Sequence, residues 1–188
     1  MSSASLQNWR SVRRSSLDDM ERAHRSVGGS GPGRRHATEQ INYAYAIILS
    51  SQFQGYCRDL HSECANDLVQ SVAGPLRTTL LAALVKNRKL DRGNPNPGNI
   101  GSDFNSFGLI FWDEVKSLDL RNQARQNRLG ELNEWRNAIA HQDFTKLPEG
   151  PQLQLKRVKT WRAACDQLAV AFDDVMRRHI QTLNGAFP

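Results

Sequence analysis

The chain has 188 residues, enough for one domain with a real hydrophobic core and too few for two of ordinary size. Hydrophobic residues make up 39% and charged residues 23%, a composition that excludes wholesale disorder. The formal net charge of +6 favours an anionic partner such as nucleic acid, although Lys and Arg are spread along the chain and form no single long run.

The first 14 residues lack the apolar stretch of a secretory signal, and no later segment approaches the ~20 apolar residues that span a bilayer. The three cysteines, Cys57, Cys64 and Cys165, are odd in number and lie within helical patterns, whereas secreted scaffolds use a dense, even set. We therefore expect a cytoplasmic protein without membrane contact, whose cysteines are reduced and buried.

The N-terminal segment, from about residue 5 to residue 26, carries a thin apolar stripe at helical spacing that includes Leu6, Trp9, Val12 and Leu17, and it predicts a helical extension over residues 1–27. The glycines and the proline that follow cannot continue a helix, so residues 28–37 are predicted to be a connector. These glycines resemble a phosphate-binding loop only superficially. That motif ends in Lys and then Ser or Thr, whereas Arg34 and Arg35 stand here, and we favour a linker.

Residues 38–188 are predicted to form one helical domain. From Thr38, a suitable N-cap, apolar residues recur every three or four positions to Leu68, which predicts a long helix. Pro75 suits the first turn of a second helix, to about Lys89, and the glycines and prolines of residues 91–108 predict a long loop. Further helices are expected over 109–120, around 129–139 and over 158–179. The fold class is therefore all-α, a bundle of about five helices with an additional N-terminal helix.

Cys57, His61 and Cys64 share one helical face and could in principle bind a metal ion. A fourth ligand has no evident source, and both cysteines belong to the apolar stripe. We favour core packing, and we expect neither a metal site nor a cofactor.

The most informative run extends from Leu129 to His141 and ends in Arg136-Asn137-Ala138-Ile139-Ala140-His141. It resembles the signature of the HEPN domain family: an arginine, a polar residue, and a histidine after four intervening positions. Residues 53–60, in which an aromatic pair precedes Arg58-Asp59-Leu60, resemble the second helix of the RiboL-PSP-HEPN branch. The likeness covers about residues 38–183. It departs from the family at Gln54, where an acidic residue is frequent.

This resemblance implies a metal-independent endoribonuclease that cleaves single-stranded RNA, with Arg136 and His141 as catalytic residues and Asn137 as a supporting residue. Histidine can move a proton at neutral pH, and the planar arginine fork can hold phosphate oxygens while charge grows on them. The implied products are a 2′,3′-cyclic phosphate and a 5′-hydroxyl.

Five residues at about 100° each would place Arg136 and His141 roughly 140° apart on an ideal helix. His141 should therefore lie in the last turn. The family brings two copies of the motif together across a two-fold axis, so the resemblance implies a homodimer.

Simpler interpretations stay open. Arg136 and His141 could merely cap a helix, because a histidine suits the C-terminal end of the helix dipole. Arg34 and Arg35 could contact nucleic acid phosphates, although a solvated linker end is the safer interpretation. We expect His179 to be a core or interface histidine.

Two functions are compatible with this resemblance. The first is an RNA-cleaving toxin or phage-defence effector, which would bring a cognate antitoxin protein as a partner. The alternative is a HEPN-like module that dimerises and binds RNA or protein without cutting. Gln54 and the modest net charge keep the alternative open.

Overall fold

The computed structural model describes residues 2–28, 34–147 and 150–185, and every regular element in these ranges is helical. The all-α prediction is confirmed. None of the described helices combines the length and the apolar character needed to cross a membrane. The elements are α1 Ala4–Asn8, a π-helical turn Trp9–Arg13, α2 Arg14–Val27, α3 Arg34–Leu68, α4 Gly74–Val85, α5 Pro97–Phe104, α6 Phe111–Leu118, α7 Arg121–His141 and α8 Leu155–Gly185, with short 3₁₀ turns at Lys89–Asp91 and Asn105–Phe107.

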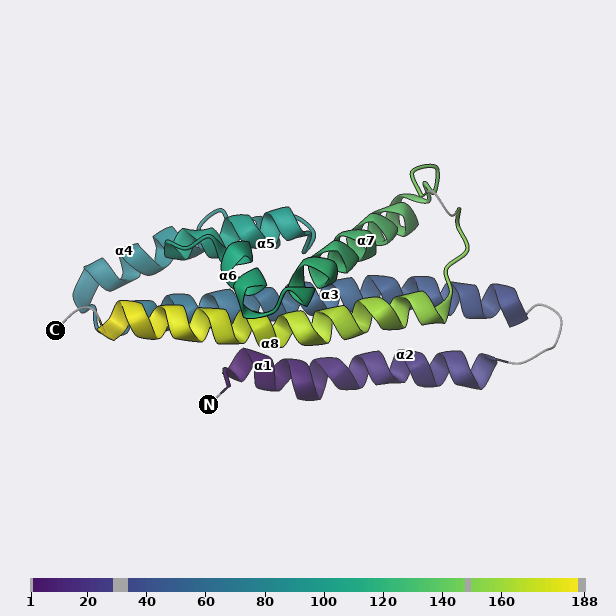
Figure 1. Ribbon diagram of the computed structural model, residues 1–188, viewed down its shortest axis with the longest axis horizontal. Helices are drawn as coiled ribbons and strands as arrows, with labels where there is room; N and C mark the ends of the chain where they lie inside the picture. The colour runs from purple at the N-terminus through teal and green to yellow at the C-terminus, as the bar shows by residue number, and fades with distance from the viewer. Residues whose placement is uncertain (1, 29–33, 148–149, 186–188) are drawn as a thin grey trace.

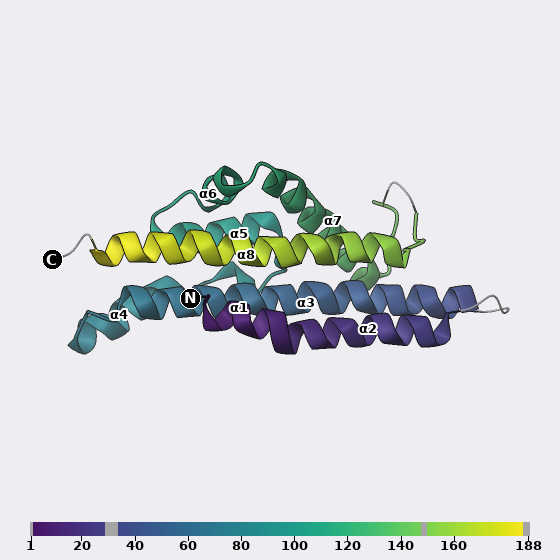
Figure 2. The same ribbon diagram turned by 60° about the horizontal axis from the view of Figure 1, so that its bottom comes forward.

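Two long helices, α3 and α8, lie side by side and run in the same direction (Figure 1). Helix α2 packs antiparallel along α3, on a different side from α8 (Figure 2). Helix α7 packs on both α3 and α8, crosses them obliquely, and its C-terminal end projects beyond the bundle (Figure 1). This arrangement leaves the end of α7 accessible.

The N-terminal helix belongs to the common hydrophobic core, where it buries Leu6, Trp9 and Leu17. The wider π-helical turn at Trp9–Arg13 shifts which residues of the N-terminal helix face the core. Val12, which the apolar stripe placed inward, is 66% exposed, whereas Arg13 reaches across α3 to Asp59 at 2.6 Å. Gly55 makes this crossing possible, because a Cβ atom there would lie 2.4 Å from the Arg13 guanidinium.

Several helix boundaries differ from the prediction, and one helix was not predicted. Helix α3 begins at Arg34 instead of Thr38, and α4 ends at Val85, four residues early. The predicted loop 91–108 contains helix α5, which Asn96 caps by accepting a hydrogen bond from the Asn99 amide at 2.8 Å. Glycine and proline concealed this helix, although proline suits a first helical turn. The predicted connector falls largely on residues 29–33, outside the described ranges.

An aromatic cluster joins the helices at the centre of the core. Phe172 of α8 lies 4.8 Å from Phe111 and 5.9 Å from Phe53 between ring centroids, and Trp9 meets Phe53 edge-on at 5.6 Å. Such contacts add to the free energy gained by burying the rings. The core therefore connects α8 to α3, α6 and the N-terminal helix.

His61 of α3 is fully buried between Phe104 and Phe107, and its Nε2 lies 3.2 Å from the Asp103 carbonyl oxygen. Burial, reinforced by the positive charge of Arg88, lowers the pKa of His61 to about 4. Cys57 and Cys64 are buried beside it on α3, as the core-packing interpretation expected.

The buried His61 predicts a loss of stability in acid. The unfolded chain binds a proton at this residue near pH 6.5 and the folded chain only near pH 4, so the free energy of unfolding should fall by about 3 kcal/mol between these pH values. Chemical denaturation across this range measures it. His61→Gln, which has no titrating group, should lack that part of the decline. Identical pH dependence in both proteins would contradict the prediction.

Candidate active site

Helix α7 ends in a Schellman motif directly after His141. Gln142 takes the left-handed conformation with φ 53°, and its amide bonds to the Ile139 carbonyl at 3.3 Å. The Asp143 amide reaches back to the Ala138 carbonyl at 3.0 Å, which completes the motif. His141 therefore stands in the last turn, as the helical geometry of the motif required, and it is exposed to solvent.

A pocket of about 470 Å³ opens beside this last turn. One wall comes from α7 and the other from the segment that follows it. The lining residues are Glu134, Asn137, Ala138, His141, Asp143, Lys146 and Leu147. The pocket therefore offers an imidazole, an amide, an ammonium group and two carboxylates within a small volume.

The segment after α7 is held in place on the side of α3. Tyr43 stacks on Phe144 at 5.6 Å, and its hydroxyl donates to the Pro151 carbonyl. The Asn42 amide donates to the Leu153 carbonyl at 2.8 Å. Within the pocket, hydrogen bonds from the side chain and the amide of Thr145 lower the pKa of Asp143 and keep its carboxylate ionised.

Arg136 lies outside this pocket lining. Its Nη1 donates to the Asn137 Oδ1 at 3.3 Å, and it has no carboxylate partner among the described residues. His141 thus lines the pocket, and Arg136 lies next to it. Asn137 lines the pocket and also accepts the hydrogen bond from Arg136. Among the described residues, the predicted catalytic pair is therefore not brought together in this pocket.

Sequence reasoning missed Asn94. Its Nδ2 donates to the Asn137 Oδ1 at 2.5 Å, although the two residues are 43 positions apart. The local sequence Asn94-Pro95-Asn96-Pro97 could have indicated a rigid, amide-rich turn. Such a turn is suited to holding a side chain in a fixed position, but the residue that Asn94 contacts could not be predicted from the sequence.

Three amide side chains anchor the backbone around Asn94. Gln54 of α3 donates to the carbonyls of Leu90 and Gly93 at 2.6 and 2.8 Å. Asn99 donates to the Asn94 carbonyl at 2.8 Å, and Asn133 of α7 donates to the Pro95 carbonyl at 3.1 Å. The Gln54 amide thus supplies two donors that a carboxylate at this position would lack.

Gln54→Glu is expected to destabilise the protein by about 1–3 kcal/mol, because the carboxylate would face two carbonyl oxygens without a proton to share. Hydrogen exchange should quicken around residues 89–94, and chemical denaturation gives the loss of stability. Gln40→Glu, at an exposed position on the same helix, is the matched control and should change little. Equal stability of the two variants would contradict this role for Gln54.

The remaining candidate residues are Arg34, Arg35 and His179. Arg34 and Arg35 open helix α3, and their side chains fall outside the described part of the structure, so their predicted contact with nucleic acid stays a prediction. The half-buried His179 places its Nε2 2.8 Å from the Phe107 carbonyl, which accounts for it as a packed histidine.

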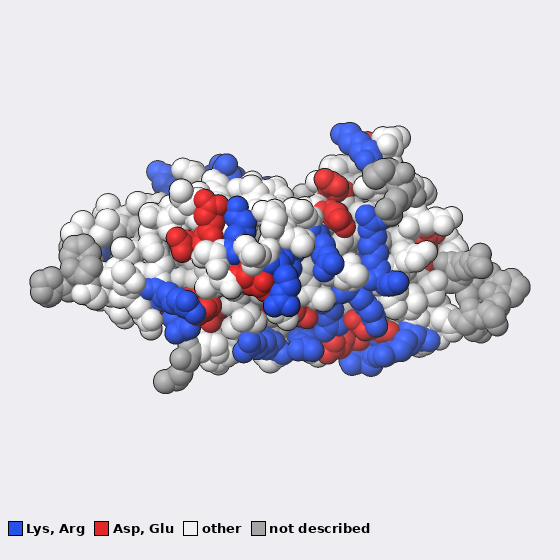
Figure 3. Space-filling model, viewed as in Figure 1, with Lys and Arg blue, Asp and Glu red and all other residues white. Residues whose placement is uncertain are grey.

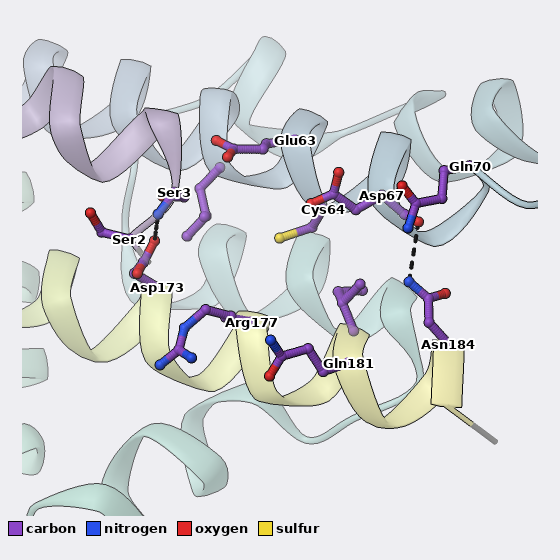
Figure 4. A pocket seen from close by; sticks show the side chains of 12 residues that line it. Ser2, Ser3, Glu63, Cys64, Asp67, Gln70, Asp173, Arg177, Gln181 and Asn184 are labelled. Carbon is purple, nitrogen blue, oxygen red and sulfur yellow. Dashed lines mark hydrogen bonds between the residues drawn. The ribbon is translucent and has the colours of Figure 1, made fainter.

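A second pocket, of about 350 Å³, lies at the opposite end of the long helices (Figure 4). Two of its three acidic residues, Glu63 and Asp173, already have structural partners. Glu63 accepts from the amides of Ala4 and Ser5 at 2.9 Å, and Asp173 accepts from the Ser3 amide at 3.1 Å. Both carboxylates therefore stabilise the N-terminus of α1.

The comparison with protein families agrees with this description. The family model for RiboL-PSP-HEPN matches residues 13–177, and the chain therefore belongs to this family of HEPN domains. The match includes α2, which precedes the segment on which the resemblance was seen. Searches among curated proteins and among solved structures found no match. The family points to an RNA-related or nuclease function.

Proposed function

We propose that this protein is an endoribonuclease that cleaves single-stranded RNA through Arg136 and His141 without needing a metal ion. One observation carries the proposal: His141 stands exposed in an open pocket at the end of α7, next to an Arg136 free of carboxylate partners in the described ranges. Membership in the RiboL-PSP-HEPN family supports it.

The chemistry requires a proton transfer and compensation of negative charge. The ribose 2′-oxygen bonds to phosphorus, the bond from phosphorus to the 5′-oxygen breaks, and the proton of the 2′-hydroxyl must leave while the 5′-oxygen gains one. An imidazole moves these protons near neutral pH. The Arg136 guanidinium offsets charge on the phosphorane, and the Asn137 amide supports it. The products carry a 2′,3′-cyclic phosphate and a 5′-hydroxyl.

A homodimer would place arginine and histidine side chains in one cleft, which the described part of a single chain does not do. One motif contains one imidazole, and its arginine lies outside the pocket lining. Two copies of the exposed end of α7, facing each other across a two-fold axis, would supply two imidazoles and two guanidinium groups to one cleft. The base and the acid could then be different residues.

Sedimentation tests the dimer. We expect a mass of twice the 21.2 kDa of the chain at micromolar concentration. Introducing a charge at the α7 end through Ala140→Glu, at an exposed position, should weaken the dimer, while Ala83→Glu, exposed on α4, serves as the control. A mass near 21 kDa at every concentration would rule out the composite cleft.

Charge is expected to contribute only modestly to RNA binding. Lys and Arg are interspersed with Asp and Glu over the face shown in Figure 3. Several cations are neutralised in ion pairs, such as Arg125 with Asp119 and Arg162 with Glu21, both at 2.9 Å. Lys146, in the pocket wall, forms no ion pair with the described residues and is suited to bind phosphate.

The alternative is a HEPN-like dimerising module that binds RNA or a partner protein without cutting. The separation of Arg136 from the pocket of His141 within one chain favours it. Binding of RNA by a protein that cleaves none of the RNAs offered would establish this alternative.

For an active enzyme, we propose a toxin or phage-defence role, with its activity inhibited by a cognate antitoxin protein.

A further inference from the structure

One oxygen atom joins two distant segments next to the candidate active site. The Asn137 Oδ1 accepts from the Asn94 Nδ2 at 2.5 Å and from the Arg136 Nη1 at 3.3 Å. The turn that carries Asn94 and the helix that carries the catalytic motif therefore meet at the Asn137 side chain.

The hydrogen bond from Arg136 determines which way the Asn137 amide faces. A guanidinium group is only a donor, so Asn137 must present its oxygen, and not its nitrogen, to Arg136. The Asn137 Nδ2 then points to the other side of the side chain and donates no hydrogen bond within the described part of the chain. Asn137 also lines the pocket of His141, where an exposed amide donor suits a phosphate oxygen.

We propose that Asn94 is a positioning residue for the proposed ribonuclease: it fixes the Asn137 amide so that Nδ2 binds a non-bridging phosphate oxygen while Oδ1 steadies Arg136. This inference rests on the proposed function. Asn94 itself does not touch the reacting atoms; it acts through Asn137.

The turn around Asn94 is rigid enough for this task. Its carbonyl groups receive hydrogen bonds from three helical segments through Gln54, Asn99 and Asn133. Gly93 is tightly enclosed, since a Cβ atom there would lie 2.8 Å from the Asn99 Nδ2. Supporting groups of this kind hold a functional side chain in place before substrate arrives.

Asn94→Asp tests the proposal, because it keeps the shape of the side chain and replaces the donating nitrogen with an oxygen. We expect kcat to fall 10- to 100-fold with little change in KM, as for a misplaced catalytic group. Asn94→Ser, which keeps a hydroxyl donor, should recover part of the rate. The control is Asn127→Ala, at an exposed position on α7 where the side-chain oxygen accepts a hydrogen bond from Gln123 at 3.0 Å; its kcat should match wild type.

A second readout separates this proposal from the ribonuclease proposal. In RNA-free protein, the ¹⁵N side-chain amide signals of Asn137, assigned by loss in Asn137→Ala, should shift in Asn94→Asp and stay unchanged in Asn127→Ala. If wild type cleaves no RNA, the proposed function fails and these signals still decide whether Asn94 orients Asn137. Unchanged Asn137 signals, or an unchanged kcat in Asn94→Asp of an active enzyme, would overturn the proposal.

Discussion

Arg136→Ala and His141→Ala should each lower the rate of RNA cleavage by a factor of about 10² or more. This is the usual cost of losing a proton-transfer group or a charge-stabilising donor. The fold should survive, because His141 is exposed and Arg136 is only half-buried at the end of α7. Single-turnover cleavage rates, measured beside thermal unfolding of each variant, separate catalysis from stability.

Two substitutions provide matched controls for this pair. Arg121→Ala removes an exposed arginine at the other end of α7, and His36→Ala removes an exposed histidine at the start of α3. Both should cleave at the wild-type rate. If all four variants and the wild type cleave equally, Arg136 and His141 are not the catalytic residues.

Trp9→Ala should lower the free energy of unfolding by about 3–5 kcal/mol, the range for deleting a large buried aromatic side chain. Trp9 is 1% exposed, lies against Phe53 and Tyr56 at 5.6 and 5.7 Å, and donates to Asp166 at 3.0 Å. The substitution would therefore open a cavity and remove the donor to a carboxylate. Chemical denaturation followed by circular dichroism measures the loss.

Val12→Ala, three residues along the same helix and 66% exposed, is the control and should change stability by less than about 0.5 kcal/mol. The comparison also tests whether the N-terminal helix folds with the rest of the chain. If Trp9→Ala is no more destabilising than Val12→Ala, this helix contributes little to the core in solution.

The helices were predictable where apolar residues repeat over many turns. Helix α8 shows this: Val158, Trp161, Cys165, Leu168 and Phe172 follow steps of three and four, and all are buried. Helix α5 was missed because its stability comes from the Asn96 cap and from packing, not from local propensity. The outward position of Val12 was missed because a π-helical turn leaves no mark in a periodic pattern.

The candidate site was predictable only in part. The spacing of Arg136 and His141 on one helix, and the need for His141 to stand in the last turn, could be derived from helix geometry. The contribution of Asn94 could not, because it depends on a turn held by Gln54 and Asn133 across the fold. Contacts between segments far apart in the chain leave no local signal.

The central claim is tested most directly by the ends of the products. Purified wild-type protein is incubated in EDTA with a single-stranded RNA and with the same RNA carrying 2′-deoxyribose at the mapped cleavage site. We expect cleavage of the all-ribose strand alone, giving a 2′,3′-cyclic phosphate and a 5′-hydroxyl, because the 2′-oxygen is the nucleophile. Equal cleavage of both strands, products with 5′-phosphates, or cleavage only after a metal ion is added would contradict the assignment of this chemistry to Arg136 and His141.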